Sequence, residues 1–187
     1  MALLLALFIR TFIVQAFKIP SGSMIPTLQI GDHILVNKLA YGVRVPFWEQ
    51  YLVRFGEVQR GDVVVFVFPE DRSKDFIKRV VAVAGDRVEV RGKNVYVNGK
   101  QIDDPYAHFE GDDPQAFGVS TRDDYGPKTV PENHVFVLGD NRDRSYDSRF
   151  WGFVDLGEVR GKAFLIYWSW DGGDRWVRWE RLGNLIY

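Results

Sequence analysis

Short runs of β-branched and aromatic residues, bounded by Gly, Pro, Asn or Asp, constrain the fold of this chain more than any other feature. Their apolar residues alternate with polar ones or continue without a break, and neither pattern has the period of an amphipathic helix. We therefore predict a mainly β fold. Asn98 and Gly99 supply a two-residue hairpin turn, because both central positions of a type I′ turn need positive φ. The expected strands cover residues 33–38, 62–68, 76–84, 87–91, 94–97, 134–138 and 161–168.

Composition excludes several classes of protein. A chain of 187 residues is long enough for one domain with a sizeable core. Its formal net charge of -1 gives no electrostatic reason to expect a nucleic-acid partner. Without any cysteine, disulfides, thiolate zinc sites and cysteine nucleophiles are excluded. We expect neither a metal nor an organic cofactor.

The N-terminal segment, residues 1–17, is apolar except at Arg10, Thr11 and Gln15. A helix needs about 20 apolar residues to cross a bilayer. We therefore interpret the segment as the last part of a membrane-anchor helix. A cleaved secretory signal is the alternative, but residues 15–18 lack the small-x-small pattern of such a site. A buried amphipathic helix is the other alternative.

Residues 102–131 differ in composition from the rest of the chain. Seven acidic residues accompany only Arg122 and Lys128, with several Gly and Pro. We predict an irregular, solvated segment. Its carboxylates make calcium binding conceivable, but no spacing resembles an EF-hand loop.

Two residues are candidates for chemistry. Ser23 lies in the sequence PSGSMIPTL at 20–28, with no histidine or cysteine nearby to activate it. Lys78 lies on a predicted strand, where alternation places it on the same apolar face as Phe76 and Val80. Burial there would lower the lysine pKa, and a neutral lysine can take a serine proton. The alternatives are a turn serine and an edge-strand lysine. A polar loop at 139–149, after the strand at 134–138, is a third candidate region.

Four motifs together resemble those of bacterial type I signal peptidases, in the order of that family. The first two are PSGSMIPTL at 20–28 and RGDVVVF at 60–66. The third is FIKRVVA at 76–82, followed by Gly85 and Asp86, and the fourth is GDNRDRSYDSR at 139–149. The resemblance covers roughly residues 10 to 155 and implies a membrane-anchored serine endopeptidase.

The resemblance implies a role for each matching position. Ser23 corresponds to the nucleophile and Lys78 to its general base. Ser145 matches the hydroxyl that orients the lysine, and Ser21 matches the hydroxyl that forms the oxyanion hole with the Ser23 N–H. The positions of two structural ion pairs are also matched, by Arg79 with Asp140 and by Asp147 with Arg149.

The implied substrates are preproteins whose signal peptides carry small residues at -1 and -3 and bind as an added strand. The residues matching the -1 pocket are Ile19, Pro20, Met24, Leu28, Phe76 and Ile77; those matching the -3 pocket are Phe17, Ile34 and Val65. From the residues alone, all of them are equally well explained as core.

The predicted organisation has three parts. A partial membrane anchor at 1–17 precedes an antiparallel β-sheet catalytic core at 18–86 and 138–187, and a small β subdomain at 87–137 is inserted into that core. The resemblance implies attachment to the bacterial cytoplasmic membrane, with the catalytic domain on its extracytoplasmic side. Membrane lipid is therefore an expected partner, and four tryptophans between 168 and 179 suggest a lipid contact.

Two other functions remain compatible with the residues. A self-cleaving serine-lysine repressor of the LexA type shares a β-rich catalytic core, but it should carry a DNA-binding domain, and none is visible. A catalytically silent, membrane-tethered β scaffold would need neither Ser23 nor Lys78. No catalytic role is expected for His33, His108 or His134.

Overall fold

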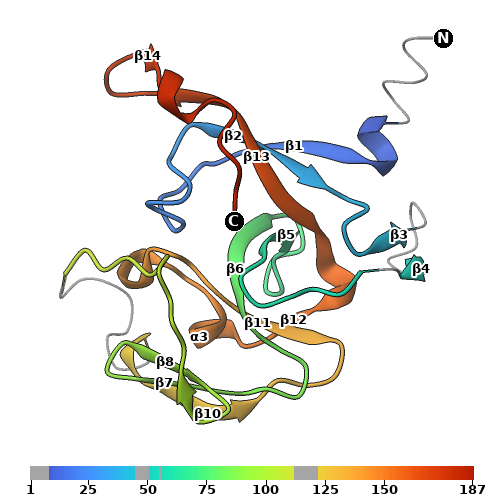
Figure 1. Ribbon diagram of the computed structural model, residues 1–187, viewed down its shortest axis with the longest axis vertical. Helices are drawn as coiled ribbons and strands as arrows, with labels where there is room; N and C mark the ends of the chain where they lie inside the picture. Colours follow the sequence, from blue (N-terminus) through green and yellow to red (C-terminus); the bar gives the residue numbers. More distant parts are fainter. Residues whose placement is uncertain (1–8, 45–50, 55, 112–121) are drawn as a thin grey trace.

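The computed structural model describes residues 9–44, 51–54, 56–111 and 122–187, and these form a mainly β structure built from antiparallel sheets (Figure 1). The prediction of the fold class is confirmed at this level. Helical structure in the described residues is limited to short segments. Those with defined bounds are α3 (Ser148–Trp151), η1 (Arg142–Arg144), η2 (Leu156–Glu158) and η3 (Trp179–Arg181).

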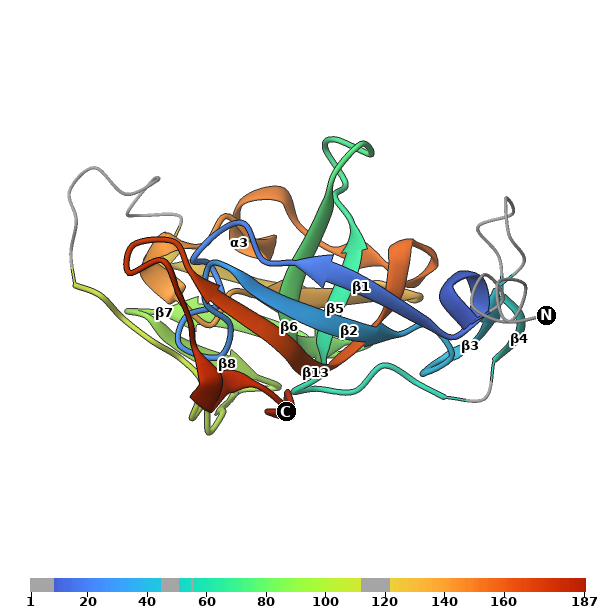
Figure 2. The same ribbon diagram turned by 90° about the horizontal axis from the view of Figure 1, so that it is seen from above.

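The largest sheet has the strand order β1-β2-β13-β5-β6-β11-β12, with β14 paired to β13. Its strands are β1 (Val14–Lys18), β2 (Asp32–Asn37), β13 (Val159–Asp171), β5 (Val63–Val67), β6 (Asp75–Val83), β11 (His134–Leu138), β12 (Val154–Asp155) and β14 (Trp176–Val177). Figure 2 shows β1, β2 and β13 lying side by side across the middle of the view.

Strand β5 is the most completely buried of the long strands described. Its sequence VVVFV is buried at every position. Val63 and Val65 belong to a core cluster with Met24 and Ile34, whereas Val64 and Phe66 belong to a different cluster. Alternate side chains of a strand point to opposite faces, so β5 is covered on both faces and has no polar alternation. The strand that carries Lys78, β6, is paired along this buried strand.

A second sheet has the order β10-β7-β8-β9. It consists of β7 (Arg87–Arg91), β8 (Asn94–Val97), β9 (Lys100–Gln101) and β10 (Tyr125–Thr129). The predicted turn at Asn98 and Gly99 is confirmed, since both residues have positive φ, of 54° and 78°. A further small sheet pairs β3 (Gly42–Arg44) with β4 (Tyr51–Arg54).

Two segments differ from the sequence-based expectations. Residues 14–17, assigned above to the membrane anchor, lie in β1, an edge strand that pairs with β2. Strand β10 lies inside the acidic segment that was expected to be irregular. The sequence pattern of this strand is weak because only Tyr125 is buried and because a proline argues against a strand. Pro127, which has no N–H, fits here because β10 is an edge strand. Within the described residues, no helix has the length and apolar character needed to span a bilayer.

Candidate active site

The loop after β1 carries Ser23 and is held by its own apolar residues. Met24 and Leu28 are completely buried in the core cluster beneath it, and the Leu28 N–H donates to the Met24 carbonyl at 2.8 Å. The main-chain oxygen of Ser23 accepts a hydrogen bond from the Asn141 N–H at 3.1 Å. The serine is therefore fixed from two sides, by the core below and by the polar loop beside it.

Lys78 meets this serine directly. Its Nζ lies 2.8 Å from Ser23 Oγ and 2.9 Å from the Ile77 carbonyl oxygen. The side chain is 4% exposed, and Nζ is 5.3 Å from the centre of the Phe76 ring. Burial lowers the pKa of Lys78 from 10.5 to about 8, although the negative charges of Asp147 and Asp140 act in the opposite direction. About a tenth of the amine is then neutral at pH 7 and about half at pH 8, and proton transfer from Ser23 requires this neutral form.

Two buried ion pairs flank the dyad. Arg79 donates from Nε and a terminal nitrogen to the two oxygens of Asp140, at 2.8 and 2.7 Å. Arg149 does the same to Asp147, at 2.8 and 2.9 Å. All four side chains are almost fully buried. The structure thus brings together the four residues that the sequence analysis assigned to ion pairs, with the bidentate geometry that gives such pairs directional strength.

Ser145 and Ser21 lie differently with respect to the dyad. Ser145 is buried, but its Oγ makes no hydrogen bond of standard geometry within the described part of the chain. Burial raises the pKa of Asp147, but Arg149, with smaller contributions from the Gly139 N–H and from nearby Ser145, keeps it lower than usual. Ser21 is exposed next to Ser23. The roles assigned to both hydroxyls by resemblance remain predictions.

The residues matched to the substrate pockets fall into two groups. Ile19, Met24, Leu28, Ile34 and Val65 form part of one buried core cluster. Phe17 and Ile77 are partly buried and pack against that same cluster. The remaining two are Pro20, which is exposed, and Phe76, which stacks on Phe68 with ring centres 4.1 Å apart.

Gly139 was not singled out by sequence reasoning, although it begins the fourth motif. A Cβ built on it would lie 2.2 Å from Ser145 Oγ and 2.5 Å from the Ser23 carbonyl oxygen. Its N–H donates to Asp147 at 3.0 Å. Only glycine therefore allows the polar loop to approach the nucleophile this closely.

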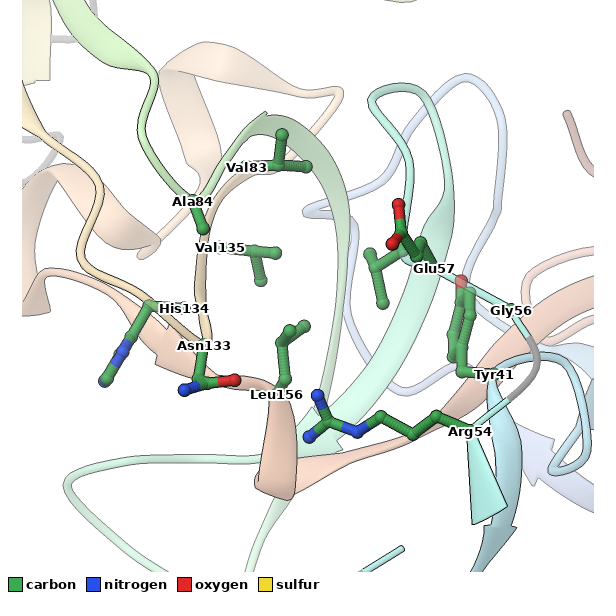
Figure 3. A pocket seen from close by; sticks show the side chains of 11 residues that line it. Tyr41, Arg54, Gly56, Glu57, Val83, Ala84, Asn133, His134, Val135 and Leu156 are labelled. Carbon is green, nitrogen blue, oxygen red and sulfur yellow. The ribbon is translucent and has the colours of Figure 1, made fainter.

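A pocket of about 610 Å³ lies away from the dyad, at the far end of β6 (Figure 3). Val83, Val135 and Leu156 form its apolar wall, and Arg54 and Glu57 extend from the opposite side. None of its lining residues belongs to the predicted site. Among the described residues, no cluster of three or more His, Asp or Glu side chains is arranged to hold a metal ion.

Comparison with known proteins identifies the family. The model of the family "Signal peptidase, peptidase S26" matches residues 1–168. Signal peptidase I of Pseudomonas aeruginosa is 38% identical over 200 aligned residues, which cover 90% of this chain and 69% of the relative. A probable signal peptidase I-2 of Synechocystis is 42% identical over 173 residues, covering 89% of this chain and 69% of the relative.

A signal peptidase I of Aquifex aeolicus is 37% identical over 218 residues, covering 89% of this chain and 80% of that protein. A crystal structure of a signal peptidase I from Enterococcus faecalis V583 is 30% identical, with a TM-score of 0.45 over 58% of this chain and 97% of that one. The family match extends across all four motifs, and therefore across Ser23, Lys78 and the residues of the buried ion pairs. The chain belongs to the signal peptidase family, peptidase S26.

Proposed function

We propose that this protein is a membrane-bound serine endopeptidase that removes signal peptides after small-x-small sites, with Ser23 as nucleophile and Lys78 as general base. The observation that carries the proposal is the 2.8 Å contact between Lys78 Nζ and Ser23 Oγ. The lowered pKa of the lysine, about 8, supports its role as a base.

The reaction begins when neutral Lys78 accepts the Ser23 proton while Oγ attacks the scissile carbonyl carbon. The resulting oxyanion is held by the Ser23 N–H and the Ser21 hydroxyl. Collapse of the tetrahedral intermediate breaks the C–N bond, and the Lys78 ammonium gives its proton to the leaving amine. Lys78 then takes a proton from water, whose oxygen attacks the ester carbonyl carbon of the acyl-enzyme. Collapse of this second intermediate breaks the bond to Ser23 Oγ and releases the signal peptide with a free carboxylate, while Lys78 returns the proton to Oγ. Ser145 orients the lysine throughout.

The open edge of β6 supports binding of the substrate as an added strand. Strand β11 pairs with β6 only at Arg79–Val83, and no other described strand pairs on that side at residues 75–78. The Val80 N–H donates to Asp62 beside β5, so the main-chain groups of Ile77 face the opposite side, where the Ile77 carbonyl also accepts from Lys78 Nζ. A peptide strand there would have its backbone hydrogen bonds satisfied beside Ser23.

The packing of the predicted pocket residues supports the preference for small side chains. Met24, Leu28 and Ile34 have no exposed surface, so their space is already filled by the protein's own core. Phe17 and Ile77 remain partly exposed above this cluster. The wall offered to the -1 and -3 residues is therefore shallow and apolar, and a large or charged side chain would clash or lose its hydration.

We place the protein at the bacterial cytoplasmic membrane, attached through its apolar N-terminal segment, with the catalytic domain on the extracytoplasmic side. Lipid contact is supported by exposed indoles in the C-terminal part of the chain, including Trp176 in β14 and Trp179 in η3, which are 66% and 61% exposed. Liposome binding should weaken when these tryptophans are replaced by leucine, and unchanged binding would refute the contact. The second sheet, whose strands lie at residues 87–129, forms the inserted subdomain expected at 87–137, except that β11 (His134–Leu138) pairs with β6 in the main sheet.

Cleavage of a peptide with a single Ala-x-Ala site tests the proposal. Ser23→Ala and Lys78→Ala should each lower kcat/KM by at least about 10³-fold. Matched controls are Ser73→Ala and Lys74→Ala, both exposed and bonded to Asp71. For the unaltered protein, kcat/KM should rise with pH and level off above about pH 8, since only neutral Lys78 is active. Near-normal turnover by Ser23→Ala would refute the mechanism.

A further inference from the structure

The acidic segment that precedes the catalytic loop is docked onto that loop. His108 forms a parallel bridge with Asn141: the His108 N–H donates to the Asp140 carbonyl at 2.7 Å, and the Arg142 N–H donates to the His108 carbonyl at 2.8 Å. Close by, the Tyr106 ring centre lies 3.7 Å from the Arg79 guanidinium carbon. Residues 104–111 therefore brace the active-site loop, in contrast to the solvated role expected from their composition.

Asn141 connects this segment to the nucleophile. Its side-chain nitrogen donates to Glu110 Oε1 at 2.7 Å and to the Gly22 carbonyl at 3.3 Å, and that carbonyl also accepts from the Ile25 N–H at 3.2 Å. Both partners are acceptors only, so the amide must present its NH₂ group to them. Asn141 is 1% exposed, and its main-chain N–H holds the carbonyl of Ser23.

The bond to Gly22 matters because of peptide planarity. The Gly22 carbonyl and the Ser23 N–H belong to one peptide unit, whose atoms lie close to a plane. Fixing the direction of that carbonyl therefore fixes the direction of the Ser23 N–H. This N–H is one of the two oxyanion donors in the function proposed above.

We propose that Glu110 is a positioning residue for catalysis, acting through Asn141 to orient the Gly22–Ser23 peptide unit. The inference rests on the proposed roles of Ser23 and its N–H. The two oxygens of Glu110 have separate partners, so its bond to Asn141 does not depend on Arg144: Oε1 accepts from Asn141, and Oε2 accepts from Arg144 Nε at 2.6 Å. Its side chain is only 27% exposed, whereas that of Arg144 is 62% exposed.

Steady-state kinetics on the same peptide test the proposal. Glu110→Ala should lower kcat by about 10- to 100-fold, less than the loss typical of deleting an oxyanion donor, because the N–H is misdirected and not removed. KM should change little, and the pH midpoint should stay at the unaltered protein's value, because Lys78 is not touched. Glu110→Gln should recover kcat to within about threefold, since its amide oxygen still accepts from Asn141.

Arg144→Ala is the matched control, because it removes the exposed partner of Glu110 and leaves the bond to Asn141. Its kcat should equal that of the unaltered protein. In an Asn141→Leu background, Glu110→Ala should have no further effect on kcat, because each change breaks the same connection from Glu110 through Asn141 to the Gly22 carbonyl. If Glu110→Ala lowers the Tm more than Arg144→Ala does, Glu110→Leu takes its place with the same expected loss of kcat.

Three results would overturn the inference: a normal kcat for Glu110→Ala, an equal loss in Glu110→Gln, or an undiminished effect in the Asn141→Leu background. Activity of Ser23→Ala is measured in the same assay. If Ser23→Ala is inactive while Glu110→Ala is normal, only the positioning role fails. If Ser23→Ala is active, the proposed function fails first.

Discussion

Lys78 and Arg79 are neighbours on β6, both are at most 4% exposed, and they have opposite environments. Arg79 makes two hydrogen bonds to Asp140, a third to the Gly61 carbonyl, and a stacking contact with Tyr106. Lys78 has no carboxylate within ion-pair distance in the described part of the chain, and its hydrogen-bond partners are Ser23 Oγ and the Ile77 carbonyl. Burial with a partner produces a fixed charge, and burial without one produces a titratable base.

The electrostatic surroundings sharpen this contrast. Desolvation is the largest influence on Lys78 and lowers its pKa, while Asp147 and Asp140 hold the value up at about 8. Each of those carboxylates is already bonded to an arginine, so it acts on the lysine at a distance. The ion pairs thereby keep the lysine pKa near the working pH while leaving its lone pair available to Ser23.

The largest effect is expected for Lys78→Met. Loss of the base should lower kcat/KM by at least about 10³-fold. Stability should rise at pH 7. The folded pKa of Lys78, about 8, lies below the ordinary value of 10.5, so below about pH 8 the folded state carries the full cost of the buried ammonium. That cost is relieved as the pH rises from about 8 to 10.5. The gain in unfolding free energy should be at most about 3 kcal/mol. Urea unfolding measures it, and a marked loss of stability would contradict the contrast.

Arg79→Met is the matched change at the paired cation. Because it leaves Asp140 buried without its partner, the unfolding free energy should fall by about 3–5 kcal/mol. Activity per folded molecule should fall less than in Lys78→Met. The same urea experiment measures the stability, and an unfolding free energy equal to that of the unaltered protein would show that Arg79 is not part of the scaffold.

Asp147→Asn should move the pH profile. Removing this negative charge removes an influence that raises the pKa of Lys78, so the midpoint of kcat/KM against pH should shift below about 8. The control is Asp75→Asn, a partly exposed residue on the same strand as Lys78, which should leave the midpoint of kcat/KM in place. A shift of the Asp147→Asn midpoint toward alkaline pH would reverse the assigned electrostatics.

The smallest effect is expected at an exposed ion pair. Arg72 contacts Glu158 at 2.7 Å, with its side chain 56% exposed. Because water and salt screen such pairs, Arg72→Ala should change the unfolding free energy by less than about 1 kcal/mol and leave kcat/KM unchanged. Thermal unfolding measured at low and high salt checks this, and a loss comparable to that of Arg79→Met would erase the distinction between buried and exposed pairs.

Local periodicity predicts the parts of the structure that depend on neighbours in sequence. The strand that carries Lys78, its placement with Phe76 and Val80, and the turn at Asn98 and Gly99 follow from alternation and from turn chemistry. Strand β1 was missed because an apolar run has no preference between an anchor and a strand until its partner β2 is known.

Contacts between distant residues were not accessible in that way. Ser23 and Lys78 are 55 positions apart, and only the resemblance of the motifs linked them. The connection from Glu110 to Asn141 spans 31 positions and joins a segment whose composition indicates solvent exposure. Its partner does lie inside the fourth motif, so the GDN sequence was the one available signal.

The packing of Lys78 against the serine loop also determines when the protein becomes catalytically competent. In a chain whose β6 has not yet been covered, this lysine is hydrated and protonated, with an ordinary pKa, and Ser23 has no base. Proteolytic capacity therefore requires that the sheet and the serine loop have closed over the amine.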